Sequence, residues 1–273
     1  MKPGLHIAVI GGDPGGAEAI APVLSALPAP DVTLHAFAYR QAMEIWRARG
    51  VAVQTVDETA TVEDCANLLR GCGAAVLLLS TSSNGIDLEK KFTQAARALA
   101  VPSVAVLDLW TNYRSRFADA AGELAFLPDR VAIMDERARS EMTGLGFPAD
   151  RLVVTGQPAF DELAAWKREA DPAFRSAIRK SFGVEEGELF VVFGSQPLAD
   201  TYGDDTSLPG HPGYTEDTVG ALLVGALEAI ARESGGRIFL LIRPHPRETA
   251  HAHSSVRSDA IRTAFHPPIT GAR

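Results

Sequence analysis

The feature that most constrains the fold is a repeated alternation between short apolar runs and segments with helical spacing of apolar residues. The apolar runs have the length and the Val, Ile, Leu and Ala content of strands that are buried on both faces. Repeated βαβ units with short turns predict a parallel sheet that is covered by helices on both faces. The expected strands are residues 5–10, 32–38, 51–56, 75–79, 103–107, 130–134 and 152–154, and the expected helices are 17–27, 41–49, 62–70, 88–100 and 136–145.

The pattern changes after Gln157, where we place the boundary between two domains, residues 1–157 and 158–273. Two helices are expected next, at residues 160–170 and 173–182. A second α/β unit follows, with a strand at 189–193, a turn-rich loop at 194–214, a long helix at 216–233 and another strand at 238–242.

The last part of the chain, residues 249–273, contains no run that predicts a strand. The second domain is therefore expected to have about two strands, where a free-standing sheet has roughly four to six. The predicted fold class is α/β, with two Rossmann-like lobes of which the second is incomplete. An incomplete parallel sheet leaves an exposed edge strand, and a homo-oligomer that pairs through this edge is a further expectation.

Composition and charge exclude several classes of function. A net charge of −8 and a pI near 5.4 argue against a nucleic-acid partner, because phosphate backbones are bound by concentrated basic surfaces. Cys65 and Cys72 are about 10 Å apart by helical rise, too far for a disulfide, and free thiols are typical of a reducing cytosol. The N-terminal residues show neither a signal peptide nor a membrane span, so a cytoplasmic location is expected.

The glycine-rich turn after the first expected strand, residues 11–16, departs from the dinucleotide-binding fingerprint. That fingerprint requires glycine at its third position, where this chain has Asp13, and an acid after the second strand, where this chain has Tyr39. An NAD cofactor is therefore disfavoured. Gly12, Asp13 and Gly15 are candidates for binding a sugar hydroxyl or an anion at a helix N-terminus, and a tight turn without a ligand is the alternative.

Polar residues also follow the fourth expected strand. Ser82, Ser83 and Asn84 stand where the carboxyl ends of parallel strands present ligand-binding groups. They are candidate substrate-binding residues, and capping of the next helix is the alternative.

The segment after the fifth expected strand combines a carboxylate, aromatic rings, an amide and two guanidinium groups. Asp108 is a candidate general base or hydroxyl acceptor, and Arg114 and Arg116 are expected to hold a phosphate or to pair with Asp108. A purely structural ion pair is the alternative. The candidate substrate-binding residues of this segment are Trp110, Asn112, Tyr113 and Arg116.

A rigid cationic segment follows the last expected strand. Prolines on both sides of His245 fix the backbone, Arg243 and Arg247 flank it, and Glu248 comes next. This arrangement suits a diphosphate, and an exposed His in a Pro-rich loop is the alternative. The remaining histidines show no metal-binding spacing, so a metal-independent reaction is expected.

Taken in order, these motifs resemble the GT-B superfamily, in particular the branch that contains UDP-N-acetylglucosamine 2-epimerases and related glycosyltransferases. Gly12-Asp13-Pro14 with Glu18-Ala19-Ile20-Ala21-Pro22 is similar to the first loop and helix of that family, and Thr155-Gly156-Gln157 with Asp161 is similar to its crossover into the second lobe. Segment 80–84 and Asp108 match its next cleft loops by position. Ser195-Gln196 and Arg243-Pro244-His245-Pro246 match the first two cleft loops of the second lobe, although the former alone is as typical of an ordinary turn before Pro197.

The resemblance implies a GT-B-type glycosyltransferase or sugar-nucleotide enzyme of cell-surface polysaccharide synthesis. Its donor would be a nucleotide-sugar or nucleoside diphosphate, bound as a substrate and not as a cofactor, and its acceptor a sugar or a glycan. Asp108 would activate the acceptor hydroxyl, while Arg243, His245 and Arg247 would stabilise charge on the leaving diphosphate.

The chain stops before the later strands that supply the family's Gly-rich turn and ribose-binding carboxylate. A shortened or truncated second lobe is therefore expected. A non-catalytic sugar- or nucleotide-binding subunit and a hydrolysing 2-epimerase are the alternatives to a transferase.

Overall fold

The computed structural model describes residues 4–27, 30–245, 248, 253 and 256–266. Its contacts divide the chain into two compact units, one that extends to Arg168 and one that begins at Glu169. Each unit is described by itself.

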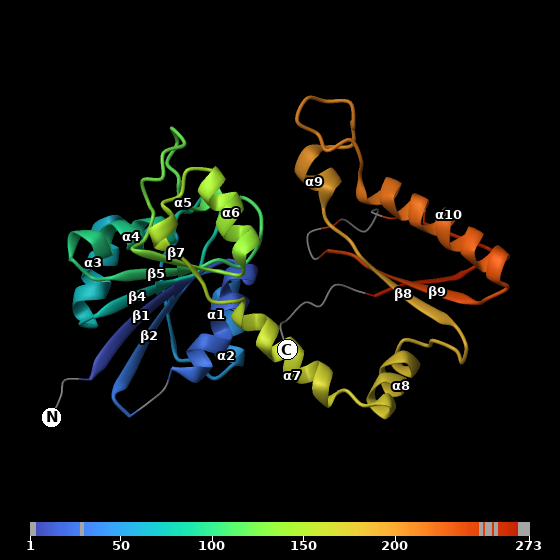
Figure 1. Ribbon diagram of the computed structural model, residues 1–273, viewed down its shortest axis with the longest axis horizontal. Coiled ribbons are helices and arrows are strands. Elements are labelled where there is room, and N and C mark those ends of the chain that lie inside the picture. The colour runs from blue at the N-terminus through green and yellow to red at the C-terminus, as the bar shows by residue number, and fades with distance from the viewer. Residues whose placement is uncertain (1–3, 28–29, 246–247, 249–252, 254–255, 267–273) are drawn as a thin grey trace. The chain divides into compact units, whose positions relative to one another are not determined.

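The first unit contains a parallel sheet of seven strands in the order β3-β2-β1-β4-β5-β6-β7 (Figure 1). The strand order reverses between β1 and β4, because the chain first builds outward to β3 and then returns to the other side of β1. The expected strands are confirmed. They are β1 (Leu5–Gly11), β2 (Val32–Ala38), β3 (Val53–Thr55), β4 (Val76–Leu79), β5 (Ser103–Val106), β6 (Arg130–Ile133) and β7 (Leu152–Val154).

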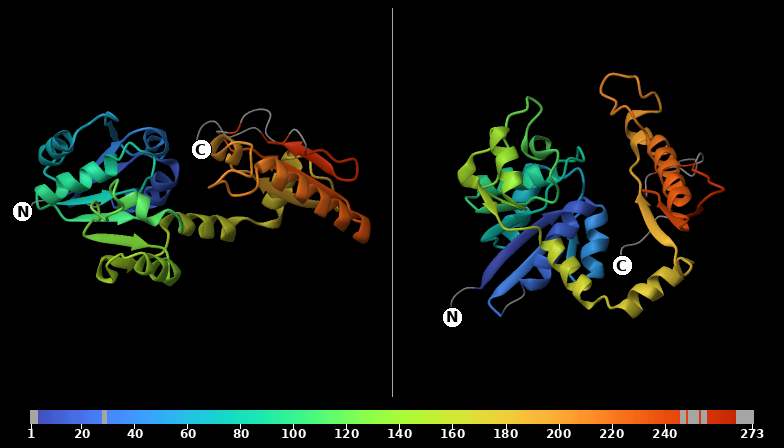
Figure 2. Two further views of the ribbon diagram at one scale, coloured as in Figure 1. Left: turned by 90° about the horizontal axis from the view of Figure 1, so that it is seen from above. Right: turned by 45° about the vertical axis from the view of Figure 1, so that its right-hand side comes forward.

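The helices cover both faces of this sheet, as Figure 2 shows from two further sides. Successive residues of β1 point to opposite faces, so Ala8 and Ile10 join one hydrophobic cluster while Ile7 and Val9 join the other. The first cluster includes residues of α3, α4 and α6, and the second includes residues of α1 and α2. The helices are α1 (Pro14–Ala26), α2 (Gln41–Ala48), α3 (Val62–Gly71), α4 (Leu88–Ala98), α5 (Tyr113–Phe117) and α6 (Glu136–Gly144), with a 3-10 turn, η1, at Ala149–Arg151.

Helix α7 (Pro158–Glu169) packs on the first unit. Arg49 Nη1 donates to Glu162 Oε1 over 2.6 Å, and the ring of Phe160 stacks on Trp110 with 6.0 Å between centroids. The boundary expected after residue 157 precedes this helix.

The second unit contains a parallel sheet of three strands in the order β10-β9-β8. A capping box formed by Thr215 and Thr218 starts its longest helix, α10, which buries Val224 and Leu227 against the sheet. The elements are α8 (Pro172–Ser181), β8 (Leu189–Gly194), α9 (Leu198–Tyr202), α10 (Glu216–Ser234), β9 (Ile238–Arg243) and β10 (Arg262–Phe265).

The expectation of about two strands in the second unit is wrong, because β10 is a third one. The segment has a single large apolar residue, Phe265, and therefore gives no strand signal of its own. Tertiary contacts place it: Arg262 pairs with Phe239 in the parallel register, its guanidinium lies over the Phe239 ring at 4.9 Å, and its Nη1 donates to Glu188 Oε2 over 2.7 Å. The strand forms because its backbone pairs with the free edge of β9.

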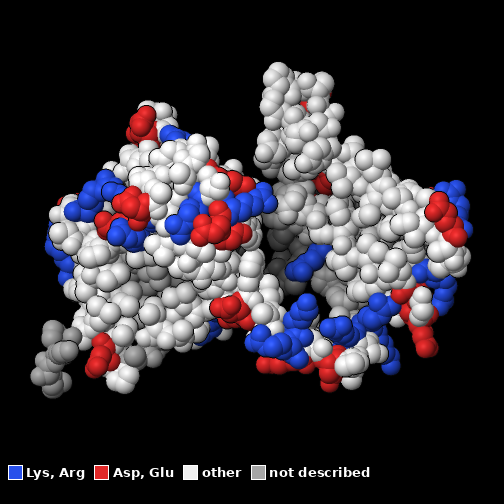
Figure 3. All heavy atoms as spheres, in the orientation of Figure 1, with Lys and Arg blue, Asp and Glu red and all other residues white. Residues whose placement is uncertain are grey.

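Charged side chains are mixed in sign on the surface of the first unit. On the face drawn in Figure 3, its Lys and Arg side chains alternate with Asp and Glu. Within the described ranges, no helix combines the length and the hydropathy that a membrane crossing requires.

Replacing Leu240 tests whether the second unit has a packed hydrophobic core around β9. Leu240 is fully buried in β9, so Leu240→Ala is expected to lower the free energy of unfolding by about 2–5 kcal/mol, whereas Leu222→Ala, at a position of α10 that is 76% exposed, should change it by less than about 0.5 kcal/mol. Urea unfolding followed by circular dichroism measures both. Equal effects of the two substitutions would contradict the packing.

Candidate functional site

The candidate site is centred on Asp108, which follows β5 at the carboxyl edge of the first sheet. One carboxylate oxygen, Oδ1, accepts hydrogen bonds from Thr81 Oγ1 over 3.2 Å and from Arg116 Nη1 over 2.5 Å. Thr81 follows β4, and Arg116 lies on the short helix α5, so three segments converge on this oxygen. The convergence fixes the orientation of the carboxylate.

Arg116 is the cation that pairs with Asp108. Its side chain is 6% exposed, and its Nη1 also donates to the backbone and hydroxyl oxygens of Thr81 over 3.2 and 2.8 Å. Arg114 turns away and donates to the carbonyl oxygens of Leu145 and Gly122. A buried guanidinium is costly unless it is paired, and Asp108 provides that partner.

The other oxygen of Asp108, Oδ2, receives no hydrogen bond from the residues that the structure describes. It faces Gly15 in the first turn of α1, where a Cβ atom would lie only 2.5 Å from it. The first N–H groups of a helix have no partner within the helix, and they give this end a partial positive charge. One oxygen of the carboxylate is thus held, while the other is available beside a helix N-terminus.

Gln157, the residue before α7, contributes to the same cluster. Its Nε2 donates to the backbone carbonyl of Asp108 over 3.0 Å, and its side chain is buried. The bond holds the loop that carries the carboxylate.

A second carboxylate, Glu89 in the first turn of α4, is buried behind this cluster. It accepts hydrogen bonds from three hydroxyl groups, those of Tyr39 (2.8 Å), Ser80 (3.1 Å) and Ser82 (2.9 Å). Burial raises the pKa of Glu89, and the hydrogen bond from Tyr39 opposes this rise without cancelling it. Burial and the neighbouring carboxylate of Glu89 also raise the pKa of Tyr39. Ser82 therefore uses its hydroxyl inside the protein.

Asn84 connects this buried group to the glycine-rich turn. Its Nδ2 donates to Asp13 Oδ1 over 2.8 Å and to Tyr39 Oη over 2.9 Å. Gly12 is required here, because a Cβ would lie 2.0 Å from a ring carbon of Tyr39. Asp13 makes no side-chain cap on α1 and is instead fixed by Asn84.

The remaining candidates of the first unit have other surroundings. Ser83 and Asn112 are exposed, and Asn112 precedes α5 with a left-handed φ of 57°. Trp110 Nε1 donates to Asp135 Oδ2 over 3.0 Å, and Tyr113 Oη donates to Glu141 Oε2 over 2.7 Å. Burial raises the pKa of Tyr113. Trp110, in the loop after β5, and Tyr113, at the start of α5, thus connect to the start and to the interior of α6.

The candidates of the second unit stand at the ends of β8 and β9. Ser195 is buried, and its Oγ has no hydrogen-bond partner among the described residues, whereas Gln196 and Arg243 are exposed and His245 is half-buried. Glu248 Oε2 lies 3.0 Å from Nε2 of the buried His253. Arg247 lies outside the described residues.

Sequence reasoning missed Glu89 and Tyr39 as parts of the site. One signal was present: Glu89 stands on the same helical stripe as Phe92 and Ala96, where α4 faces the core. A carboxylate on an apolar stripe needs buried hydrogen-bond donors, and the hydroxyl-rich segment just before it could supply them. Tyr39 offered no such signal.

No family model matches the sequence, and a search of curated proteins also found no match. The structure is similar to UDP-GlcNAc 2-epimerase from Neisseria meningitidis bound to UDP-GlcNAc, with 10% identity, a TM-score of 0.64 and coverage of 97% of this chain and 72% of that one. It is also similar to UDP-GlcNAc 2-epimerase from Methanocaldococcus jannaschii, with 13% identity, a TM-score of 0.64 and coverage of 97% of this chain and 74% of that one. For Anabaena HepE in complex with UDP-glucose, the identity is 11%, the TM-score is 0.58, and the match covers 96% of this chain and 69% of that one.

These neighbours are sugar-nucleotide proteins of the GT-B type, and the chain has the GT-B fold. The expected fold, with a smaller second lobe, is confirmed. Within the described part of the chain, no group of three His, Cys, Asp or Glu side chains is arranged to hold a metal ion.

Substitution of Glu89 tests the buried carboxylate. Its pKa is raised in the folded state, so the folded protein holds this proton more tightly than the unfolded chain does. Wild-type stability should therefore fall, relative to Glu89→Gln, as the pH rises above about 4.3, the ordinary value of a glutamate.

Chemical denaturation between pH 4 and 8 measures the effect, with Glu63→Gln on the exposed side of α3 as the control. Parallel stability profiles for wild type and Glu89→Gln would show that the burial of Glu89 has no energetic consequence.

Proposed function

We propose that this chain is a GT-B glycosyltransferase that acts on a nucleotide-sugar and a sugar or glycan acceptor, in cell-surface polysaccharide synthesis. The observation that supports the proposal is the environment of Asp108, with Oδ1 held by Arg116 and Thr81 and Oδ2 available beside the N-terminus of α1. In open α/β sheets, ligands bind outside the carboxyl ends of the strands where the strand order reverses, and this site lies beside that point.

In this proposal, Oδ2 of Asp108 accepts the proton of the acceptor hydroxyl. The hydroxyl oxygen attacks the anomeric carbon of the donor sugar, and the bond from that carbon to the diphosphate breaks, so that the nucleoside diphosphate leaves. Arg116 and Thr81 keep the carboxylate in one orientation, which lowers the entropic cost of the step. The free N–H groups at the start of α1 offer hydrogen bonds to a sugar hydroxyl or an anion. Arg243, His245 and Arg247 of the second unit remain predicted contacts of the leaving diphosphate.

A hydrolysing 2-epimerase is the second candidate. The similarity to two 2-epimerases, each with a TM-score of 0.64, favours it. The two reactions differ in the attacking group, which is water in the epimerase and a hydroxyl of the acceptor in the transferase.

A panel of UDP-, GDP- and CMP-sugars, each with and without glycan acceptors, tests the proposal. We expect nucleotide release that depends on one donor base and is stimulated by an acceptor. Acceptor-independent release together with an altered free sugar would indicate the epimerase. Thermal stabilisation by a nucleotide without turnover would indicate a binding subunit. If the panel gave neither turnover nor stabilisation, that result would contradict a sugar-nucleotide function.

Asp108→Asn tests the proposed base. The amide keeps the size of the side chain but cannot accept the proton, so kcat should fall by about 10²- to 10⁴-fold with little change in KM. Asp31→Asn, at an exposed position before β2, is the matched control and should retain full activity. An active Asp108→Asn variant would exclude Asp108 as the base.

A further inference from the structure

A separate cavity of about 850 Å³ lies at the opposite edge of the first sheet from Asp108. Ser103, Asp129 and Arg151, which line it, stand where β5, β6 and β7 begin, whereas Asp108 follows the end of β5. The cavity is therefore distinct from the candidate site. Its volume lies within the range of small-molecule pockets, about 300–1,000 Å³.

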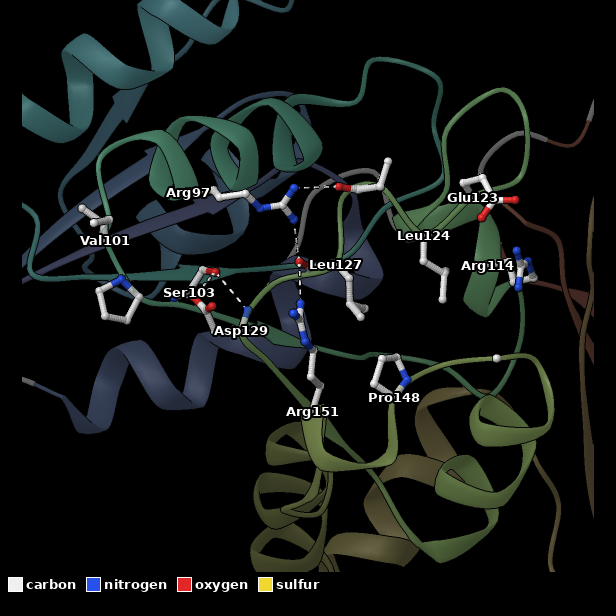
Figure 4. Close-up of a pocket in the computed structure, with 14 residues that line it drawn as sticks. Arg97, Val101, Ser103, Arg114, Glu123, Leu124, Leu127, Asp129, Pro148 and Arg151 are labelled. Atoms are coloured by element: carbon white, nitrogen blue, oxygen red, sulfur yellow. Dashed lines mark hydrogen bonds between the residues drawn. The ribbon is translucent and has the colours of Figure 1, made fainter.

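Three arginines from different segments line this cavity, and their guanidinium groups donate to backbone carbonyl oxygens. Figure 4 shows the bonds of Arg97 and Arg151. Arg97 and Arg151 approach the Leu127 oxygen from two sides, with distances of 3.0 and 3.4 Å. Arg97 also donates to Ala125, Arg151 to Pro128, and Arg114 to Leu145 and Gly122. These bonds fix the guanidinium groups and still leave several of the five N–H donors of each one available.

The three arginines outnumber the two carboxylates that line the same cavity, Glu123 and Asp129. No described Asp or Glu oxygen lies within 4.0 Å of Arg97, Arg114 or Arg151. Asp129 lines the cavity but accepts from the backbone N–H and the hydroxyl of Ser103 through Oδ2, over 2.8 and 3.0 Å. Carbonyl oxygens satisfy hydrogen bonds but carry no full negative charge, so the two guanidinium groups that share the Leu127 oxygen repel each other, and a bound anion would reduce this repulsion.

The wall also carries apolar side chains, together with the hydroxyl of Ser103 and the carboxylates of Glu123 and Asp129. Val101, Pro102, Leu124, Leu127 and Pro148 line the cavity together with the arginines. A pocket that combines an apolar wall with a few fixed cationic groups suits a ligand with a charged end and an apolar body. Arginine pairs well with phosphate because its planar fork matches two phosphate oxygens.

We propose that this cavity is a second ligand site, which binds a small phosphorylated molecule through Arg97, Arg114 and Arg151 and packs its apolar part against Leu124 and Leu127. The proposal does not depend on the reaction at Asp108. It accounts for three arginines that line one hollow without a described carboxylate within ion-pair distance.

Isothermal titration with pyrophosphate, phenyl phosphate and inorganic phosphate tests the site on the full chain. We expect phenyl phosphate to bind more tightly than inorganic phosphate, because only the former contacts the apolar wall. Arg97→Gln and Arg151→Gln should each weaken binding of pyrophosphate and phenyl phosphate by about tenfold or more, and Arg70→Gln, on the exposed side of α3, should leave it unchanged. Arg243→Gln, which removes a predicted contact of the leaving diphosphate, should leave phenyl phosphate binding unchanged, and this separates the cavity from the proposed active site.

Arg97 and Arg151 also hold the backbone, so a variant that keeps all three charges is needed. Leu124→Trp fills the cavity and should abolish phenyl phosphate binding in a protein with a wild-type circular dichroism spectrum. A crystal structure of the wild type with pyrophosphate decides the matter if any variant fails to fold. An empty cavity in those crystals, or undiminished binding in Leu124→Trp and in the arginine variants, would overturn the proposal.

Discussion

The reversal of strand order between β1 and β4 is the constraint on which the candidate site depends. Parallel strands end at the same edge, and the reversal sends the loops after β1 and β4 to opposite sides of the sheet, so that polar groups gather between them. Glycines at positions 12 and 15 then allow the turn after β1 to lie against Tyr39 and Asp108, respectively. The strand order thus determines which side chains meet at this edge of the sheet.

Two carboxylates at this edge have different environments. Glu89 accepts hydrogen bonds from three hydroxyl groups, forms no ion pair with a described Lys or Arg, and has a raised pKa. Asp108 is held by a guanidinium and keeps one available oxygen. The first fixes Tyr39, Ser80 and Ser82, and the second is the base in the proposed reaction. The hydroxyl of Ser82, expected from the sequence to bind a ligand, thus donates to Glu89 inside the protein.

The second unit shows how a short sheet can be completed by tertiary contacts. The β9 strand is buried along most of its length between β8 and β10, and α10 covers one face. The two edge strands are only partly buried, because each has a single neighbour among the described strands. Pairing with another chain through one of these edges remains a prediction.

The sequence by itself determined the elements of the fold and their order. Apolar periodicity and glycine or capping residues are local signals, and they located every strand from β1 to β9 and most of the helices. It also identified Asp108 and its possible partners, but it left open whether Arg114 or Arg116 pairs with Asp108. Only the tertiary structure decided this pairing, the burial of Glu89, the third strand β10 and the cavity lined by three arginines. The physical reason is that these features depend on contacts between segments far apart in the chain, and no local pattern encodes such contacts. Arg116 is held beside Asp108 by Thr81, 35 residues away, and Glu89 accepts a hydrogen bond from Tyr39, 50 residues away.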